Sequence, residues 1–302
     1  MNAVLEFNNI VRAYKRNVPV LNGVTFSVNG GEVVGLLGRN GAGKTTLIRI
    51  AMGMLHPDAG SVQVFGVSPT ARAVEVKQRI GFVAEDQVLP GASSIGELIA
   101  FHRHLFPSWD EQLQRQILHR FSLDCRTRIR MLSKGQARQV ALLCAVCHRP
   151  ELLILDEPAA GLDPAARREF LEVSIQLLNR EGTTILFSSH YMNDVERIGG
   201  RVILLADGRV RLDSDLDRLR ESFCVAMVPR ASAQSVEAIR RIPGCVGARL
   251  VFENWHGVFH DAPEAVEAQL KKLLGANGIR CVRVPLEELF VELVGREQDR
   301  EG

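Results

Sequence analysis

The sequence has 302 residues, of which 46% are hydrophobic and 24% are charged, enough for one large α/β domain or a large and a small one. These proportions are typical of a soluble globular protein and exclude a disordered, collagenous or coiled-coil chain. The 37 lysine and arginine residues nearly balance 35 aspartate and glutamate residues, so the net charge of +2 gives no sign of a nucleic-acid partner. The longest apolar run, around 141–147, is far short of the roughly 18 residues that a membrane-spanning helix needs.

The N-terminal residues lack the basic start, apolar stretch and cleavage site of an export signal, so we expect a cytoplasmic location. Six scattered cysteines are then expected to be reduced thiols. Cys144 and Cys147 form a CxxC pair. Because there is no second pair and the run 140–147 is typical of a buried helix, we favour packing over a metal or redox role.

In chain order, alternating apolar residues predict a strand over 24–28, and a turn at 29–31 leads to a second strand over 33–37. Apolar residues spaced as on one helix face then predict a helix over 47–55. Further continuous apolar strands, separated by helical stretches, predict a mostly parallel sheet covered on both faces. These strands lie at 152–155, 184–187 and 202–205, and Asp207–Gly208 turns the last one back.

Two other regions have a different pattern. Between about 91 and 131 the strand signal disappears, and Asp110 is placed to cap a helix, which indicates a helical insertion. From residue 222 the predicted order is βαββαβ, typical of a small ferredoxin-like domain, and a last helix follows over 286–294. We therefore expect a domain at 1–220, with its helical subdomain at about 86–135, and an accessory domain at 221–302.

The strongest motif begins at Gly38 and matches GxxxxGK[ST] between a predicted strand and a predicted helix. Gly38, Gly41 and Gly43 allow successive backbone N–H groups to point at phosphate oxygens. Lys44 offers a charge to terminal phosphates, and Thr45 offers a hydroxyl to Mg²⁺. The predicted nucleotide-binding residues are Gly38, Arg39, Asn40, Gly41, Ala42, Gly43, Lys44, Thr45 and Thr46.

The apolar strand at 152–155 ends in two acids, Asp156 and Glu157. Adjacent carboxylates at the end of a buried strand need a cation or a reacting water, because unpaired buried charge is costly. Asp156 is the candidate that holds Mg²⁺ from its outer coordination sphere, and Glu157 is the candidate general base for the attacking water.

Together with Leu132-Ser-Lys-Gly-Gln136, these motifs resemble those of an ATP-binding cassette (ABC) ATPase. The resemblance covers about residues 3–220 and includes Tyr14 as the matching adenine-stacking aromatic, the Gly161-Leu-Asp163 turn and His190 at a strand end. It implies an α/β P-loop NTPase with an antiparallel β subdomain, a parallel sheet core and the helical insertion, to which the small C-terminal α+β domain is added.

The resemblance also implies a head-to-tail dimer, in which ATP and Mg²⁺ lie between one subunit's phosphate loop and the partner's signature. His190 would contact the γ-phosphate and orient the water. Outside such a family, a histidine at a strand end is more often structural, and Asp163 before Pro164 suffices as a helix N-cap. The residues expected to face the partner's ATP are Ser133, Lys134, Gly135, Gln136 and Asp163.

Two positions depart from the family's pattern. Glu85 stands where many members have a glutamine that senses Mg²⁺ and the transport domain; a carboxylate can ligate Mg²⁺, and Gln87 is the alternative. Lys134 stands where glycine is usual. We hypothesise that Lys134 adds attraction for the γ-phosphate; the alternative is a solvated surface charge.

The resemblance implies an ATP-hydrolysing transporter subunit at the cytoplasmic face of the inner membrane, paired with a second ATPase and a separate permease, without nucleic acid. The insertion would receive the permease, with 101–109 as candidate contact, and 104–110 and 285–295 resemble bacterial exporters of the drug, antibiotic and lipid-like class. One alternative is a soluble ABC protein acting on ribosomes or DNA, which usually has two cassettes or a long coiled coil. A small-molecule kinase would leave Leu132–Gln136 and His190 unexplained.

Overall fold

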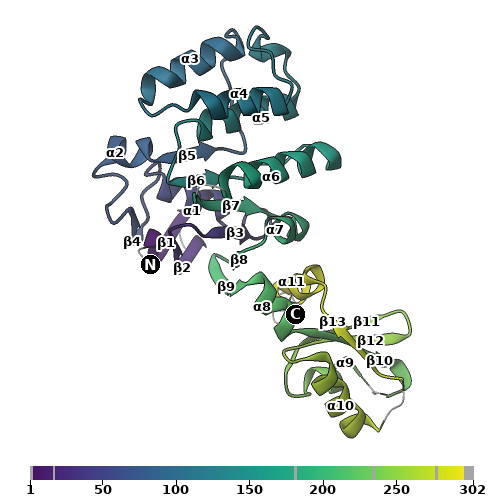
Figure 1. The fold of residues 1–302 in the computed structure, drawn as a ribbon. Coiled ribbons are helices and arrows are strands. Elements are labelled where there is room, and N and C mark those ends of the chain that lie inside the picture. Colours follow the sequence, from purple (N-terminus) through teal and green to yellow (C-terminus); the bar gives the residue numbers. More distant parts are fainter. Residues whose placement is uncertain (1–2, 16–17, 180–181, 233–234, 276–277, 296–302) are drawn as a thin grey trace. The chain divides into compact units, whose positions relative to one another are not determined.

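The chain forms two compact units, residues 1–213 and 214–302, of which the first contains two sheets and the second contains one (Figure 1). The proposed domain boundary after residue 220 falls inside α8 (Leu216–Ser222), seven residues beyond this division. The computed structural model describes residues 3–15, 18–179, 182–232, 235–275 and 278–295.

An antiparallel sheet opens the first unit. It consists of β1 (Ala3–Lys15), β2 (Val18–Asn29) and β4 (Ala59–Val64) in the order β2-β1-β4. The predicted alternation in β2 is confirmed, since Val24, Phe26 and Val28 are buried. The turn at 29–31 connects two different sheets rather than two paired strands, because β2 pairs with β1, a strand that the sequence pattern did not reveal.

A second sheet has the order β5-β6-β7-β3-β8-β9, and its pairings from β5 to β8 are parallel, as predicted. β3 lies in the middle, and β6 and β7 lie on one side of it. Segments that follow β3, β6 and β7 therefore meet at the carboxyl edge of the sheet, where open α/β sheets bind ligands. The strands are β3 (Val33–Leu37), β5 (Ile80–Val83), β6 (Leu152–Leu155), β7 (Thr184–Ser189), β8 (Arg201–Ala206) and β9 (Arg209–Asp215).

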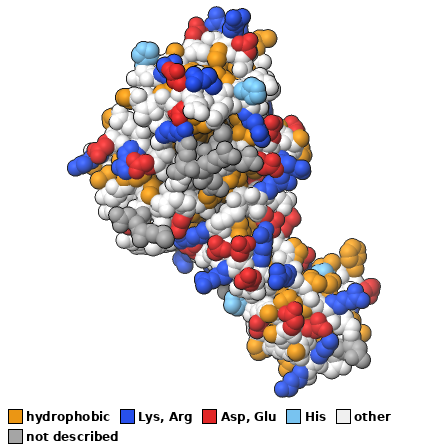
Figure 2. Space-filling view, viewed as in Figure 1, with side chains coloured by type: hydrophobic (Ala, Val, Ile, Leu, Met, Phe, Trp, Pro, Cys, Tyr) orange, Lys and Arg blue, Asp and Glu red, His pale blue; other side chains and the backbone are white. Residues whose placement is uncertain are grey.

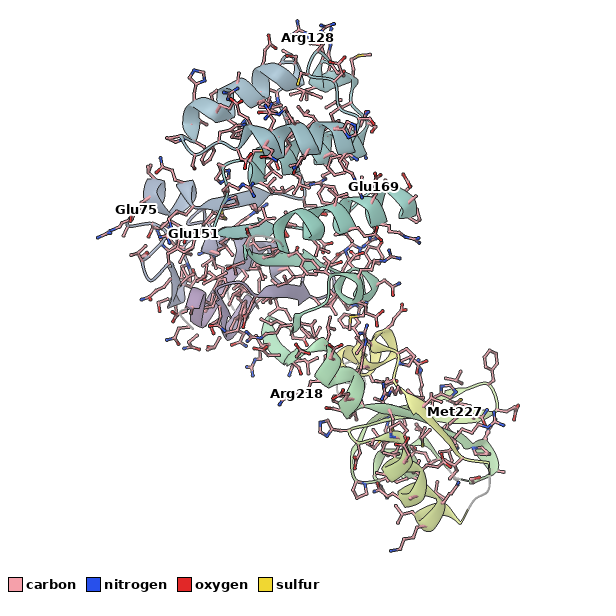
Figure 3. The ribbon with its side chains drawn as sticks, viewed as in Figure 1. Glu75, Arg128, Glu151, Glu169, Arg218 and Met227 are labelled. Carbon is pink, nitrogen blue, oxygen red and sulfur yellow. The ribbon has the colours of Figure 1, made fainter. Side chains whose placement is uncertain are left out.

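The predicted helical insertion contains α3 (Ile95–Leu105) and α4 (Glu111–Arg120), and α5 (Lys134–Val146), which begins at its end, packs against both helices and against β5 (Figure 1). Asp110 caps α4 as expected, because its Oδ1 accepts a hydrogen bond of 2.7 Å from the backbone N–H of Leu113. Figure 3 labels Arg128 at the far end of this insertion. The remaining helices of the unit are α1 (Lys44–Ala51), α2 (Ala73–Gln78), α6 (Pro164–Asn179) and α7 (Met192–Ile198), and Ile129–Met131 form a 3₁₀ turn.

Both cysteines of the CxxC pair are buried, Cys144 on α5 and Cys147 directly after its last residue. Burial raises the pKa of Cys144 to about 12 and raises that of Cys147 as well, which disfavours the thiolate that metal binding and redox chemistry require. Both side chains are packed as small apolar groups.

The second unit has the strand and helix order that the sequence predicts. Its four strands pair antiparallel in the order β11-β12-β10-β13, the arrangement of a ferredoxin-like sheet. Ile239, Phe259 and Leu270 form part of a separate core. The elements are β10 (Cys224–Pro229), α9 (Val236–Arg240), β11 (Cys245–Val251), β12 (Asn254–Phe259), α10 (Pro263–Leu274), β13 (Arg280–Arg283) and α11 (Leu286–Gly295), and a 3₁₀ turn spans Arg230–Ser232. The sequence pattern predicts the first helix of this unit over 233–241, and residues 233–234 lie outside the described residues.

Among the described residues, no helix combines the length and the apolar character that crossing a membrane requires. On the face seen in Figure 2, basic and acidic side chains are interspersed rather than gathered into one basic patch.

Candidate nucleotide site

The phosphate-loop motif connects β3 to α1 with a backbone that only glycine adopts easily. Gly41 and Gly43 have φ angles of +85° and +103°. A Cβ atom on Gly38 would lie 2.5 Å from the carbonyl oxygen of Leu205, and one on Gly43 would lie 2.6 Å from Leu21 Cδ2. The loop is therefore a close-packed backbone cradle at the start of a helix, which fits a phosphate group.

Lys44 is buried in this cradle. Its Nζ donates to the carbonyl oxygens of Gly38 and Arg39 at 2.7 and 3.3 Å. The same Nζ lies 3.1 Å from Oε1 of Glu157. The two groups form an ion pair, but their geometry is not that of a hydrogen bond. Oε1 is thus a buried carboxylate oxygen without a hydrogen-bond donor among the described residues, and it is free to accept one from a water or ligand.

Asp156 lies at the end of β6 and is bonded to two hydroxyl groups. Ser188 Oγ and Thr45 Oγ1 donate to its Oδ1 at 2.7 and 3.3 Å. Burial raises the pKa of Asp156, and the charge of Glu157 raises it further, while the two hydroxyl groups and Lys44 oppose these effects. A cation bound here would relieve the repulsion between these buried carboxylates. These oxygen donors fit Mg²⁺.

Glu157 and His190 are brought together from two strands. His190 Nδ1 lies 2.8 Å from Oε2 of Glu157. Glu157 has a φ of +44°, a strained conformation for a residue other than glycine. Its backbone N–H donates to Ser188 Oγ at 2.8 Å, and this bond holds the strained residue in place.

Glu85 follows β5 and shares the electrostatic field of these acids. Burial raises the pKa of Glu85, and the charges of Glu157, Asp86 and Asp156 raise it further, whereas Arg138 opposes the shift. Arg138, on α5, donates to the carbonyl oxygens of Ala84 and Glu85 and so ties this loop to the helical insertion.

The alternative residue, Gln87, has a local contact. Its Oε1 accepts a bond of 3.3 Å from the backbone N–H of Ala84. Glu85, by contrast, interacts with the charges of Asp156 and Glu157. Both side chains carry oxygen atoms that can ligate Mg²⁺, and only the carboxylate of Glu85 adds negative charge.

The signature residues act as helix caps within this chain. Ser133 Oγ accepts from the backbone N–H of Gln136 at 3.2 Å, and Gln136 Oε1 accepts from the N–H of Ser133 at 3.0 Å, so the two form a capping box. Asp163 Oδ1 similarly accepts bonds of 3.0 Å from the first N–H groups of α6. A Cβ atom on Gly135 would lie 3.6 Å from Leu162, so the signature and the Asp163 turn are neighbours.

Tyr14 lies beside the phosphate loop. Its hydroxyl group is 3.3 Å from Thr46 Oγ1, and 55% of the residue remains exposed. The guanidinium carbon of Arg12 lies 5.5 Å from the ring centroid. An exposed ring anchored at the helix of the phosphate loop is available for stacking.

Comparison with known proteins agrees with this geometry. The family model described as ABC transporter matches residues 21–160. Nod factor export ATP-binding protein I of Burkholderia orbicola (strain AU 1054) is 33% identical over 309 residues, and the alignment covers 98% of both chains. The chain belongs to the ABC transporter family. It is the ATP-binding and ATP-hydrolysing subunit of an ABC transporter, as the resemblance implied.

Other relatives of this ABC ATPase share the cassette. ABC transporter ATP-binding protein YtrB of Bacillus subtilis (strain 168) is 30% identical over 220 residues, covering 73% of this chain and 75% of the relative. A solved structure titled as the ATP binding subunit of an ABC transporter superposes with a TM-score of 0.64 at 30% identity, over 72% of this chain and 92% of that one. The dimeric cassette MJ0796, at 22% identity and a TM-score of 0.62, shares the fold and covers 70% of this chain and 98% of its own.

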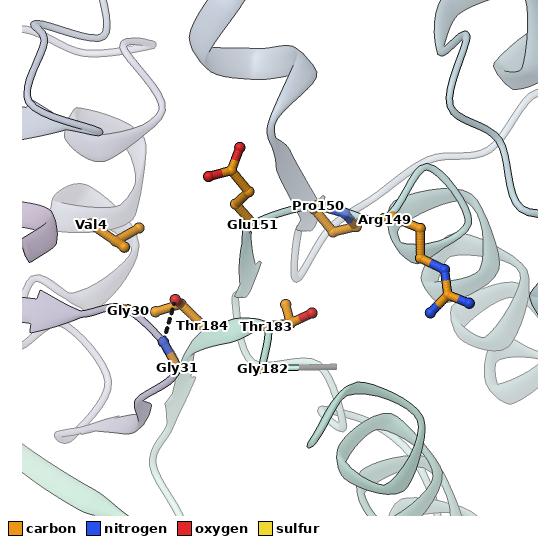
Figure 4. Close-up of a pocket in the computed structure, with 9 residues that line it drawn as sticks. All are labelled: Val4, Gly30, Gly31, Arg149, Pro150, Glu151, Gly182, Thr183 and Thr184. Carbon is orange, nitrogen blue, oxygen red and sulfur yellow. Dashed lines mark hydrogen bonds between the residues drawn. The ribbon is translucent and has the colours of Figure 1, made fainter. Parts of the chain in front are cut away.

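A cavity of 450 Å³ in this ABC ATPase lies at the opposite edge of the parallel sheet (Figure 4). It is lined by residues that precede strands, among them Gly31 before β3, Glu151 before β6 and Thr183 before β7. Because the phosphate loop, Asp156 and His190 follow those same strands, this cavity is separate from the nucleotide site.

Sequence reasoning missed two polar residues of the ABC ATPase site, Ser188 and Arg138. Ser188 bonds both Asp156 and the backbone of Glu157. Its signal was a polar pair, Ser188–Ser189, that ends an apolar strand immediately before His190. Arg138 lies two residues beyond the signature and is half-buried, without a sequence pattern that would separate it from a surface arginine.

Proposed function

We propose that this ABC ATPase powers export through a separate permease, with two ATPase subunits closing around ATP. Relatives that align over nearly the whole chain are named ATP-binding proteins of Nod factor export, which supports export rather than action on ribosomes or DNA. The observation that carries the catalytic part is the Glu157 carboxylate, buried between Lys44 and His190 with one oxygen lacking a donor.

For nucleotide binding, the residues Gly38–Thr46 hold the phosphates and Tyr14 stacks on the adenine. The glycine cradle and the hydroxyl contact between Tyr14 and Thr46 support this assignment. Thr45, Asp156 and Glu85 hold Mg²⁺, which when bound offsets phosphate charge. The chain offers three oxygen-bearing groups whose electrostatics favour a cation.

For hydrolysis, Glu157 accepts the proton of the attacking water and His190 orients the γ-phosphate and the water. The carboxylate Oε2 is held by His190 Nδ1, which leaves Oε1 for the water proton. A positioned general base is typically worth about 10² to 10⁴ in rate.

For pairing, Ser133, Lys134, Gly135, Gln136 and Asp163 face the γ-phosphate bound by the partner subunit. Ser133 and Lys134 are exposed at the start of α5, a helix of 13 residues whose N-terminal N–H groups favour an anion. The same residues serve as caps in one chain, so both roles are compatible.

For coupling, the exposed side chains of Phe101 and Leu105 on α3 contact the permease at the cytoplasmic face of the inner membrane. Phe101 and Leu105 are 59% and 50% exposed, whereas Phe106 packs against His148 with 4.1 Å between ring centroids. The permease contact proposed at 101–109 is thereby narrowed to the exposed face of α3.

The coupling proposal is tested by purifying the tagged chain from detergent-solubilised membranes. The wild-type chain is expected to bring down a polytopic membrane protein, and Phe101→Asp to lose it while keeping ATP turnover. Glu75→Ala, which changes an exposed residue of α2, is the matched control. Recovery of ribosomes or DNA in place of a membrane protein would contradict the transport function.

The domain division at 220 and 221 remains our proposal, in which the second unit is an accessory domain. It has its own sheet and core, which supports independent folding. A chain that ends at residue 220 is expected to bind ATP like the full chain in an equilibrium titration; loss of binding would show that the boundary is misplaced.

A further inference from the structure

One arginine ties the helix that follows Asp163 to the loop that carries His190. Arg167, on α6, donates from Nε to Asp194 Oδ1 at 2.7 Å and from Nη2 to Oδ2. Its guanidinium carbon lies 3.8 Å from the ring centroid of Tyr191, the residue after His190. The arginine therefore contacts the segment that follows His190 in two ways, through a bidentate ion pair with Asp194 and a cation–π contact with Tyr191.

The acceptor, Asp194, organises the backbone on both sides of His190. Ser189 Oγ donates to Asp194 Oδ2 at 2.7 Å, and the N–H of Tyr191 donates to Ser189 Oγ at 3.0 Å. The ring centroids of His190 and Tyr191 lie 3.9 Å apart. Because the residues before and after His190 are both held, the imidazole has little freedom to leave Glu157.

The same network reaches the phosphate loop. The carbonyl oxygen of Ser189 accepts a bond of 3.3 Å from the N–H of Gly38. The Arg167–Asp194 pair thus supports a loop that contacts both the phosphate cradle and, through His190, the carboxylate of Glu157.

At its other end, Arg167 belongs to the first turn of α6. Its backbone N–H bonds the carbonyl oxygen of Asp163 at 2.9 Å, while the Asp163 side chain caps the helix. A shift of the Asp163 turn therefore moves the guanidinium that holds Asp194 and Tyr191.

We propose that Arg167 is a positioning residue for ATP hydrolysis. Through Asp194 and Tyr191 it keeps His190 Nδ1 against Glu157, and it transmits the position of the Asp163 turn to His190. The ion pair is largely buried, so an unpaired Asp194 is costly, and a lysine cannot reproduce the planar fork or the ring contact. The inference rests on the proposed role of His190.

The test compares Arg167→Lys and Arg167→Ala with Arg168→Ala, which changes the exposed neighbouring arginine of α6. Two measurements are made. Steady-state kinetics gives kcat and KM for ATP, and a long-range ¹H–¹⁵N spectrum of histidine-labelled protein gives the histidine signals. The His190 signals are assigned by their loss in His190→Ala. We expect both Arg167 variants to lower kcat about tenfold or more, with KM within about twofold, and to move the His190 Nδ1 signal. Arg168→Ala is expected to change neither the kinetic constants nor the His190 signals.

If the His190 signals of the folded Arg167→Lys variant do not move, the proposal is overturned, whatever the value of kcat. It is also overturned if those signals move while kcat is unchanged. If Arg167→Ala does not fold, Arg167→Lys decides, because it keeps the charge. Full turnover by His190→Ala would instead contradict the proposed function of His190. The two failures are therefore distinguishable.

Discussion

His190 Nδ1 lies 2.8 Å from one carboxylate oxygen of Glu157, and the other oxygen lies 3.1 Å from Lys44 Nζ. One carboxylate is thus shared by an imidazole and by the cation expected to bind phosphate. We expect bound phosphate to compete with Glu157 for Lys44, which would leave Oε1 to accept the proton of the attacking water.

Glu157→Gln is expected to lower kcat by about 10² to 10⁴ while ATP binding is kept, because the amide preserves the shape but accepts no proton. With saturating ATP, this variant is expected to accumulate as a dimer on gel filtration. The wild-type protein under the same conditions is the control. A monomeric Glu157→Gln protein would contradict the paired site.

Lys44→Ala is expected to abolish both ATP binding and turnover. It also leaves Glu157 as a buried charge without its cation, which typically costs about 3–5 kcal/mol of stability. Adding Glu157→Gln removes that charge, so the double variant is expected to recover most of the lost melting temperature but none of the binding. A double variant as unstable as Lys44→Ala would show that the ion pair is not the cause.

Asp156→Asn is expected to stabilise the nucleotide-free protein at pH 7. Burial holds the pKa of Asp156 above its ordinary value, so between the ordinary and the raised pKa the folded state binds more protons than the unfolded state. The free energy of unfolding therefore falls as the pH rises through that window, and the asparagine variant escapes this loss. Melting temperatures of the wild-type protein and Asp156→Asn, measured against pH, should converge in acid and separate as the pH rises. Parallel curves for the two proteins would contradict the prediction.

Glu85→Ala is expected to raise the Mg²⁺ concentration that half-maximal turnover needs, whereas Gln87→Ala is not. The reason is that Glu85 interacts electrostatically with Asp156 and Glu157, while Gln87 bonds its own loop. Turnover is measured against Mg²⁺ for both variants. If Gln87→Ala needs more Mg²⁺ for half-maximal turnover and Glu85→Ala does not, the metal ligand is Gln87.

Lys134→Ala is expected to lower the rate of ATP turnover and to make that rate less dependent on salt. The reason is that the lysine lies exposed at the start of α5, where its charge is proposed to attract the γ-phosphate bound by the partner subunit. Exposed charges contribute little in isolation, so we expect an effect of a few-fold at most. Rates are compared at low and high salt, with Lys77→Ala on α2 as control. Unchanged rates and salt dependence would leave Lys134 as a solvated surface charge.

Features that depend on neighbouring residues could be predicted from the sequence. The nine residues from Gly38 to Thr46 form one continuous loop, so their spacing alone indicates the phosphate cradle. The cap at Asp110 and the succession of strands and helices along the second unit follow in the same way from local periodicity and capping chemistry.

The contacts between distant side chains could not be predicted and became visible in the folded chain. Ser188 bonds Asp156 across 32 residues, Arg167 bonds Asp194 across 27, and Arg138 bonds Ala84 across 54. The separation of β2 and β3 into two sheets was likewise invisible in their patterns. The physical reason is that apolar periodicity shows which face of an element is buried, whereas a polar contact depends on strand order, which brings residues together without any local signature.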